Sequence, residues 1–262
     1  MSQSSDQNIT APLFQTYESG TGFGECIFGE YNSQAIPDFC ADMLSADYWQ
    51  TNNAVTGTAQ GRGTTWFVRY TNQLTESHWV LRHYYRGGLM GKMIKDHYLF
   101  TGKKNTRAAC EFELLKKMAA LNLPAPKPIA YRVKQHGLVY QADLLSSRIE
   151  NAQDLVGLLS SPPKEAVISE KSWGDIGATI KRFHAHGIYH HDLNAHNILF
   201  DANGLVYLID FDRGEFRNKH QKEWQQSNMM RLKRSFMKEK ERIAEFQWTM
   251  KHWDMLMAGY NQ

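Results

Sequence analysis

The sequence of 262 residues is 42% hydrophobic and 22% charged, which is enough apolar material for the core of one large domain or of two lobes. Its formal net charge of +3 does not indicate a nucleic-acid partner, and its apolar runs fall short of the roughly 18 residues that a membrane span needs. The three cysteines are far apart, lack metal-binding spacing and predict reduced thiols.

The first half of the chain has the composition of strands and turns around one long helix. Strands are predicted where β-branched and aromatic residues gather, in short pieces within 13–36, at 63–70, at 78–85 and as a pair within 128–145. Residues 105–123 predict a helix, because apolar residues recur at steps of three and four before Pro124 ends the pattern. A short amphipathic helix is expected at residues 38–50. The polar residues 1–12 are expected to form a disordered tail, without the features of a secretory signal.

The second half of the chain predicts mainly helices. These are expected at residues 151–161, at 172–187 and across most of 222–258. In the second of them, Ser172 and Asp175 resemble a capping pair, and Gly187 stands where a C-terminal cap glycine belongs.

Strands followed by helices predict an α+β fold rather than an alternating α/β fold. We expect an N-lobe at residues 13–145, rich in β-structure, and a reduced, mostly helical C-lobe at 146–262. The hinge between them would lie near residues 142–150.

A cluster of polar residues surrounds two short apolar runs in the second half. Asp192 precedes the run NILF, which begins with Asn197, and Asp210 follows the run LVYLI, with the sequence Asp-Ala-Asn-Gly between the runs. This pattern predicts a β-hairpin whose two ends bring polar groups together. A surface hairpin with polar turn residues is the alternative interpretation, but it does not account for all three spacings at once.

The arrangement resembles the catalytic core of the protein-kinase-like fold, in which His-x-Asp-x-x-x-x-Asn, a hairpin and Asp-Phe-Gly follow one another. The resemblance implies that Asp192 is the catalytic residue, which positions the acceptor hydroxyl and accepts its proton. It implies that Asn197 and Asp210 bind Mg²⁺, and through it the phosphates of ATP. His190 would support the loop.

The N-terminal half would then bind the nucleotide. Gly61 and Gly63 precede a predicted strand and resemble a glycine-rich loop, whose backbone amides can approach phosphates closely. A plain turn explains the same two glycines, and Gly57 is a further candidate for the motif.

A cation for the phosphates is expected on the next strand. Arg82 occupies the place where kinases usually carry a lysine, and its planar fork can bind phosphate. An exposed strand residue is the alternative interpretation of Arg82, and Arg86 and Lys92 are rival candidates. On the predicted helix, Glu111 is the expected partner that orients this cation, with Glu113 as its rival.

Two departures from protein kinases bear on the acceptor. Asp212 replaces the glycine after Asp210-Phe211, where it would tolerate unusual backbone or add a metal or substrate contact. The chain after Asp210 is too short for an activation segment and a peptide-docking lobe. We therefore expect no protein substrate, and a small molecule or a lipid-linked sugar as the acceptor.

Among small kinase-like families, the sequence resembles the lipopolysaccharide-core sugar kinases, in particular those acting on 3-deoxy-D-manno-octulosonic acid (Kdo). The resemblance covers about residues 57–235 and depends on GRGTTWFV, WVLRHYYRGG, LPAPKPIAYRV, GIYHHDLNAHNILFD and LIDFDRGEFR. It implies transfer of the γ-phosphate of ATP to the 4-hydroxyl of Kdo on a lipid A precursor, at the cytoplasmic face of a Gram-negative inner membrane. Arg82 and the Asp-Phe-Asp sequence look usual for this family.

The segment 216–251 carries ten Lys and Arg residues against four Glu, together with several aromatic residues. Such a helix could rest on an anionic membrane surface, and Arg213, Arg217 and Lys219 could meet an anionic acceptor. A core helix with one solvated charged face has the same composition. An aminoglycoside- or choline-type phosphotransferase and a non-catalytic nucleotide-binding module are the alternative functions.

Overall fold

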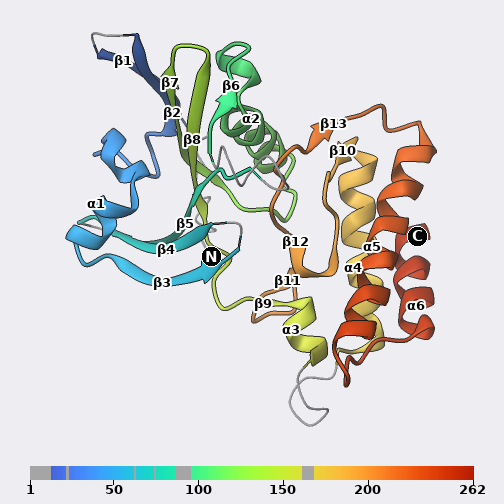
Figure 1. Ribbon diagram of the computed structural model, residues 1–262. Coiled ribbons are helices and arrows are strands. Elements are labelled where there is room, and N and C mark those ends of the chain that lie inside the picture. The colour runs from blue at the N-terminus through green and yellow to red at the C-terminus, as the bar shows by residue number, and fades with distance from the viewer. Residues whose placement is uncertain (1–12, 22–23, 62, 74, 87–95, 161–167) are drawn as a thin grey trace, which may run out of the picture.

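The computed structural model describes residues 13–21, 24–61, 63–73, 75–86, 96–160 and 168–262. The predicted tail at residues 1–12 and the rival cation Lys92 lie outside these ranges. Within them, a large antiparallel sheet is followed by a group of helices and short strands (Figure 1). The predicted α+β class is therefore confirmed.

The large sheet has eight strands in the order β1-β2-β7-β8-β5-β4-β3, with β6 paired to β8. Their bounds are β1 Phe14–Thr21, β2 Glu25–Asn32, β3 Val55–Gln60, β4 Thr64–Thr71, β5 Glu76–His83, β6 Tyr98–Leu99, β7 Pro128–His136 and β8 Val139–Ser147. Strand β8 passes residue 145, where the N-lobe was expected to end, and the boundary between the lobes stays a prediction.

Strand β5 shows how the sheet places functional residues. Successive side chains of a strand point to opposite faces, so Trp79 and Leu81 are buried in the core on one face. Val80 and Arg82 consequently point to the other face, where they line a cavity. Strand β3 was not predicted, because it is a sheet-edge strand with mostly exposed residues and little apolar patterning.

Helix α2 (Arg107–Ala120) packs against strand β7 and, to a lesser extent, β8. Its apolar stripe includes Ala108, Phe112 and Met118, all of them buried, as the three- and four-residue steps predicted. Glu111 is buried on the same helix. The helix expected at residues 38–50 is divided, because the extended backbone of Ser45 separates a 3₁₀ turn (Ala41–Leu44) from α1 (Ala46–Thr51).

The described residues of the second half form three long helices, two hairpin strands and several short elements. Their bounds are β9 Gln153–Asp154, α3 Leu155–Ser160, α4 Glu170–Ala185, β10 Ile188–Tyr189, a 3₁₀ turn Ala195–Asn197, β11 Ile198–Phe200, β12 Val206–Leu208, β13 Glu215–Phe216, α5 Lys222–Arg242 and α6 Met250–Asn261. The predicted capping pair of α4 is wrong, since the cap is Ser169, whose hydroxyl accepts a hydrogen bond from the Ser172 amide at 3.1 Å. Gly187 follows this helix with a φ of 74°.

Helices α4 and α6 pack against each other, and Figure 1 shows both of them in the helical part of the molecule, together with α5. Glycines allow this approach, because a Cβ atom at Gly177 would lie 1.9 Å from the carbonyl oxygen of Leu256. One hydrophobic cluster then extends from Phe112 on α2 through Phe183 on α4 to Leu256 on α6. The shared core places the sheet and the helices on either side of the polar residues described next.

Candidate active site

The loop after β10 is held in place by His190. Its Nε2–H donates to the carbonyl oxygen of Ile209 at 2.9 Å, and its Nδ1 accepts from the Asp192 amide at 3.2 Å. Burial lowers the pKa of His190, which favours the neutral ring that this pair of hydrogen bonds needs. The ring therefore connects the loop to the end of the hairpin.

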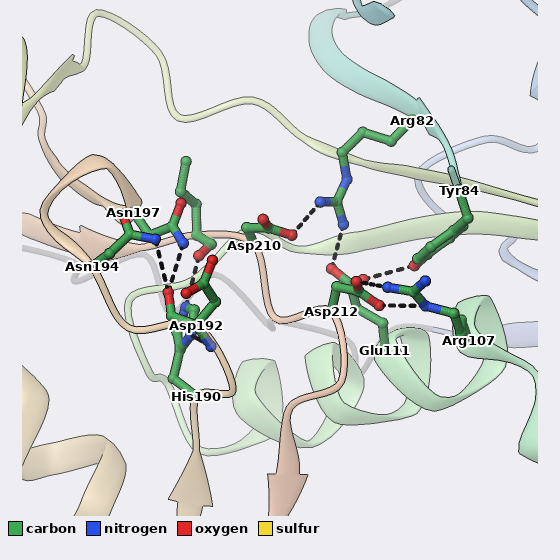
Figure 2. Close-up of polar contacts among 11 residues, drawn as sticks. Arg82, Tyr84, Arg107, Glu111, His190, Asp192, Asn194, Asn197, Asp210 and Asp212 are labelled. Atoms are coloured by element: carbon green, nitrogen blue, oxygen red, sulfur yellow. Dashed lines mark hydrogen bonds and ion pairs between the residues drawn. The ribbon is translucent and has the colours of Figure 1, made fainter. Parts of the chain in front are cut away.

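Two asparagines fix the backbone of Asp192. Its carbonyl oxygen accepts from Asn194 Nδ2 at 3.1 Å and from Asn197 Nδ2 at 2.9 Å (Figure 2). The side chain of Asp192 is 49% exposed, with Arg231 Nη1 at 3.6 Å from one carboxylate oxygen. Asp192 thus has a fixed backbone and a carboxylate that solvent and a substrate can reach. Asn194 was not among the site residues predicted from the sequence.

The predicted hairpin brings Asp210 beside Asn197. Strands β11 and β12 pair from Ile198 with Leu208, and the Ile209 amide donates to the Asn197 carbonyl at 3.0 Å. The backbone after the hairpin is unusual at Asp210, where φ is 62°. Arg213 also has a positive φ, of 59°. Asp212 does not, so the unusual backbone expected at Asp212 occurs instead at Asp210 and Arg213.

Arg82 connects the two halves of the site. Its guanidinium bonds Glu111 Oε1 and Asp210 Oδ1, each at 2.5 Å, while the Tyr84 hydroxyl donates to Glu111 Oε2 at 2.7 Å. Burial alone would lower the pKa of Arg82, but the charges of Glu111 and Asp210 raise it above its ordinary value. Figure 2 shows Asp210 between Arg82 and the loop that carries Asp192 and Asn197.

The rival candidates lie elsewhere. Glu113 pairs with Lys116 at 2.8 Å on an exposed part of α2. Arg86 lies over the ring of Tyr98, 5.0 Å from its centroid. Among the described residues, Arg82 is therefore the cation that meets the predicted glutamate, and its role with phosphate stays a prediction.

Asp212 has a partner that the sequence did not indicate. Arg107 Nε donates to Asp212 Oδ1 at 2.8 Å, and a second guanidinium nitrogen bonds the other oxygen. Arg107 and Glu111 are four residues apart and share one face of α2. Helix α2 thus contacts both Arg82 on the sheet and the segment after Asp210. The sequence shows that Arg107 and Glu111 are four residues apart, but it does not show that their partners are Asp212 and Arg82.

The glycine motif forms a tight turn between β3 and β4. The Gly61 amide donates to the Gly63 carbonyl at 3.0 Å, and both residues line a cavity of about 360 Å³ with Arg82 and Asp210. A side chain at Gly63 would collide with the ring of Tyr85, since a Cβ atom would lie 1.9 Å from it.

A second cavity of about 410 Å³ adjoins the first, because Arg82 and Asp210 line both. Its walls include Val80, Leu199 and Ile209, so one part is apolar. A planar base with an attached triphosphate combines these two kinds of surface. Sequence analysis did not predict the apolar wall, which is assembled from several strands.

Asn197 and Asp210 also line the second cavity, as does Arg82. An amide oxygen and a carboxylate are hard ligands of the kind that Mg²⁺ takes together with substrate phosphates. No group of three or more His, Cys, Asp or Glu side chains within the described ranges is placed to hold a metal ion. Asn197 and Asp210 could thus supply part of a donor set that the phosphates of a nucleotide would complete.

Comparisons with known proteins agree with this geometry. The model of the lipopolysaccharide kinase (Kdo/WaaP) family matches residues 46–260. Proteins named 3-deoxy-D-manno-octulosonic acid kinase are similar: one from Vibrio parahaemolyticus is 46% identical over 80% of this chain and 84% of its own. One from Photobacterium profundum is 45% identical and covers 87% of this chain and 90% of its own. One from Haemophilus influenzae is 43% identical and covers 88% of this chain and 95% of its own.

A solved structure described as WaaP in complex with acyl carrier protein has the same fold. It superposes with a TM-score of 0.51 at 12% identity, covering 84% of this chain and 85% of that chain. The protein-kinase-like fold that the sequence predicted is thereby confirmed.

Proposed function

The chain belongs to the lipopolysaccharide kinase (Kdo/WaaP) family, and we propose that it transfers the γ-phosphate of ATP to the 4-hydroxyl of Kdo on a lipid A precursor. The observation that carries this proposal is the 42–47% identity to proteins named as kinases of that sugar. The reaction is a step of lipopolysaccharide core synthesis. An aminoglycoside- or choline-type phosphotransferase is not favoured by these relatives.

Asp192 is the proposed catalytic residue. Its exposed carboxylate orients the acceptor hydroxyl and takes its proton as the oxygen attacks phosphorus. The hydrogen bonds from Asn194 and Asn197 to its backbone carbonyl fix the loop from which this carboxylate projects. His190 stabilises the loop and takes no part in proton transfer, because both of its ring nitrogens are occupied.

The nucleotide is held by residues from both lobes. Asn197 and Asp210 would hold Mg²⁺, which neutralises charge on the triphosphate. Arg82 binds a phosphate through its guanidinium, which Glu111 orients. Gly61 and Gly63 line the same cavity as Arg82, and the apolar wall of the adjoining cavity takes the base.

The lipid-linked acceptor suggests a position at the cytoplasmic face of the inner membrane, as a peripheral protein. No helix among the described residues has the length and apolar character needed to cross a membrane. On α5, Met230 and Met237 are 48% exposed beside several cations, which suits contact with an anionic lipid surface. The aromatic side chains of Trp224 and Phe236 are buried, so they belong to the core.

The direct test is incubation with γ-labelled ATP, Mg²⁺ and Kdo-bearing lipid A precursor, followed by location of the label. We expect one labelled phosphate on the 4-hydroxyl of Kdo, and no comparable labelling of kanamycin or choline. Labelling of either soluble acceptor at a higher rate than the lipid would contradict the proposal.

A further inference from the structure

A basic pocket that does not include Asp210 borders Asp192. It has a volume of about 540 Å³ and lies between the catalytic loop and helix α5. The loop contributes Asp192, Asn194 and His196, and the helix contributes Arg231, Arg234 and Lys238. We propose that this pocket binds the carboxylate of the acceptor sugar, with Arg231 as its principal contact. This inference rests on the proposed function.

The charges of the pocket leave an excess of cations. The buried Glu239 is paired with Arg242, whose Nε donates to it at 2.8 Å, and lies 3.3 Å from His196 Nε2. Arg234 and Lys238 have no ion-pair partner in the part of the chain that the structure describes. Arg231 has a contact of 3.6 Å with Asp192, which is longer than a hydrogen bond. A concave surface with unmatched cations favours an anionic ligand.

Helix α5 is attached to the catalytic loop at two points. Asn228 Nδ2 donates to the His190 carbonyl at 2.7 Å, and the Ser235 hydroxyl accepts from the Ala195 amide at 2.9 Å. Arg231 lies between these two attachments along the helix. The hydrogen bonds therefore fix the helix backbone that carries Arg231 beside the catalytic loop, and a binding residue for a small anion needs a scaffold fixed in this way.

The chemistry of the acceptor explains why a cation is needed there. In Kdo, the carboxylate is attached to the anomeric carbon, which is next but one to the carbon that bears the 4-hydroxyl. A sugar that presents this hydroxyl to Asp192 brings its own carboxylate close to the carboxylate of Asp192. Because two such charges repel, a cation beside both would offset the repulsion, and Arg231 Nη1 lies 3.6 Å from Asp192 Oδ1.

The experiment compares three acceptors under the same conditions. These are Kdo-bearing lipid A precursor, the same lipid with the Kdo carboxyl reduced to an alcohol, and the lipid without its lipid A phosphates. For the unchanged chain we expect kcat/KM to fall roughly 10- to 100-fold when the carboxyl is reduced, as for the loss of a charged hydrogen bond. In Arg231→Ala this preference should disappear, and Arg231→Lys should keep part of it.

The preference is a ratio of two kcat/KM values, so any effect of the variant on Asp192 that is the same for both acceptors cancels. Lys222→Ala is the matched control, because it removes a cation from the same helix outside the pocket and should keep the full preference. The inference is overturned if the unchanged chain accepts the reduced sugar equally well, if Arg231→Ala keeps the preference, or if Lys222→Ala loses it. A preference that follows the lipid phosphates instead would also overturn it. If no acceptor is labelled, the proposed function fails as well.

Discussion

At the scale of single residues, charge compensation around Arg82 is the central feature of the site. Glu111 is 3% exposed, so its carboxylate depends on Arg82 and on the Tyr84 hydroxyl for solvation. Removing one partner of a buried ion pair is costlier than removing both, because it leaves a charge without compensation.

We therefore expect Arg82→Met to lower the free energy of unfolding by about 3 kcal/mol. The double variant Arg82→Met with Glu111→Gln should be more stable than Arg82→Met alone, although it has lost both charges. Urea denaturation of the three chains measures the difference. A double variant less stable than Arg82→Met would show that Glu111 needs no compensating charge.

His184 predicts a pH dependence of stability. Its ring is buried between Tyr260, whose hydroxyl lies 2.7 Å from Nδ1, and Asn228, whose Oδ1 lies 3.2 Å from Nε2. Burial lowers the pKa of His184 to about 4. Because the folded pKa is depressed, the stabilisation is fully present above the unfolded pKa of about 6.5 and is lost as pH falls toward 4.

This loss should reach about 3 kcal/mol between pH 6.5 and pH 4. In His184→Gln the pH dependence of stability that comes from His184 disappears. The unchanged chain therefore loses its advantage in unfolding free energy over His184→Gln as the pH falls. His220→Gln, which changes an exposed histidine, should leave the dependence as it is. Parallel curves for the unchanged chain and His184→Gln would refute the assignment.

Residues close in sequence were the easiest to predict. Asp192, Asn197 and Asp210 were identified because a short hairpin fixes their relation within the sequence itself. Arg107 and Arg231 were missed, because their partners Asp212 and Asp192 come from remote segments that only the folded chain brings near.

At the scale of elements, the contact between α4 and α6 depends on glycine. A Cβ atom at Gly177 would lie 1.9 Å from the Leu256 carbonyl and 2.6 Å from the Tyr260 amide nitrogen. Both of these atoms belong to the backbone of α6, so neither can move without shifting the helix. Gly174, on the same helix, has open space at its Cβ position.

Gly177→Ala should consequently lower the free energy of unfolding by about 1–3 kcal/mol, as overpacking does. Gly174→Ala should leave it unchanged or raise it by up to about 1 kcal/mol, because alanine favours a helix. The melting temperatures of the two variants distinguish the cost of overpacking between the helices from the gain in helix propensity that alanine brings. Equal effects of the two substitutions would show that the helices do not meet at Gly177.

Long elements with a strong apolar period were predicted from sequence, and α2 and α4 are examples. The division of the helix at residues 38–50 was not, because it depends on the extended backbone at Ser45 rather than on the apolar pattern. Strand β3 was missed because an exposed edge strand carries little of that pattern.

At the scale of the whole molecule, the basic and apolar surface of α5 bears on how the chain meets a lipid substrate. Met230 and Met237 lie two turns apart on one exposed face of the helix, near Lys233 and Arg234. Such a surface would gain both apolar burial and attraction to anionic lipid headgroups.

Met237→Glu should therefore weaken binding to vesicles that contain anionic phospholipid by about tenfold. Leu138→Glu is the matched control, because it adds the same charge at an exposed leucine in the turn between β7 and β8. Sedimentation with vesicles at low and high salt measures both. Equal losses in the two variants would place the membrane contact elsewhere.

The central claim is that Asp192 performs proton transfer at a site that binds ATP independently of it. The measurement that tests it most directly is the single-turnover rate of phosphate transfer from labelled ATP to the Kdo-bearing lipid in Asp192→Ala, with ATP affinity determined on the same sample. We predict a rate lower by roughly 10²- to 10⁴-fold with nearly unchanged ATP affinity. A rate equal to that of the unchanged chain would contradict the account.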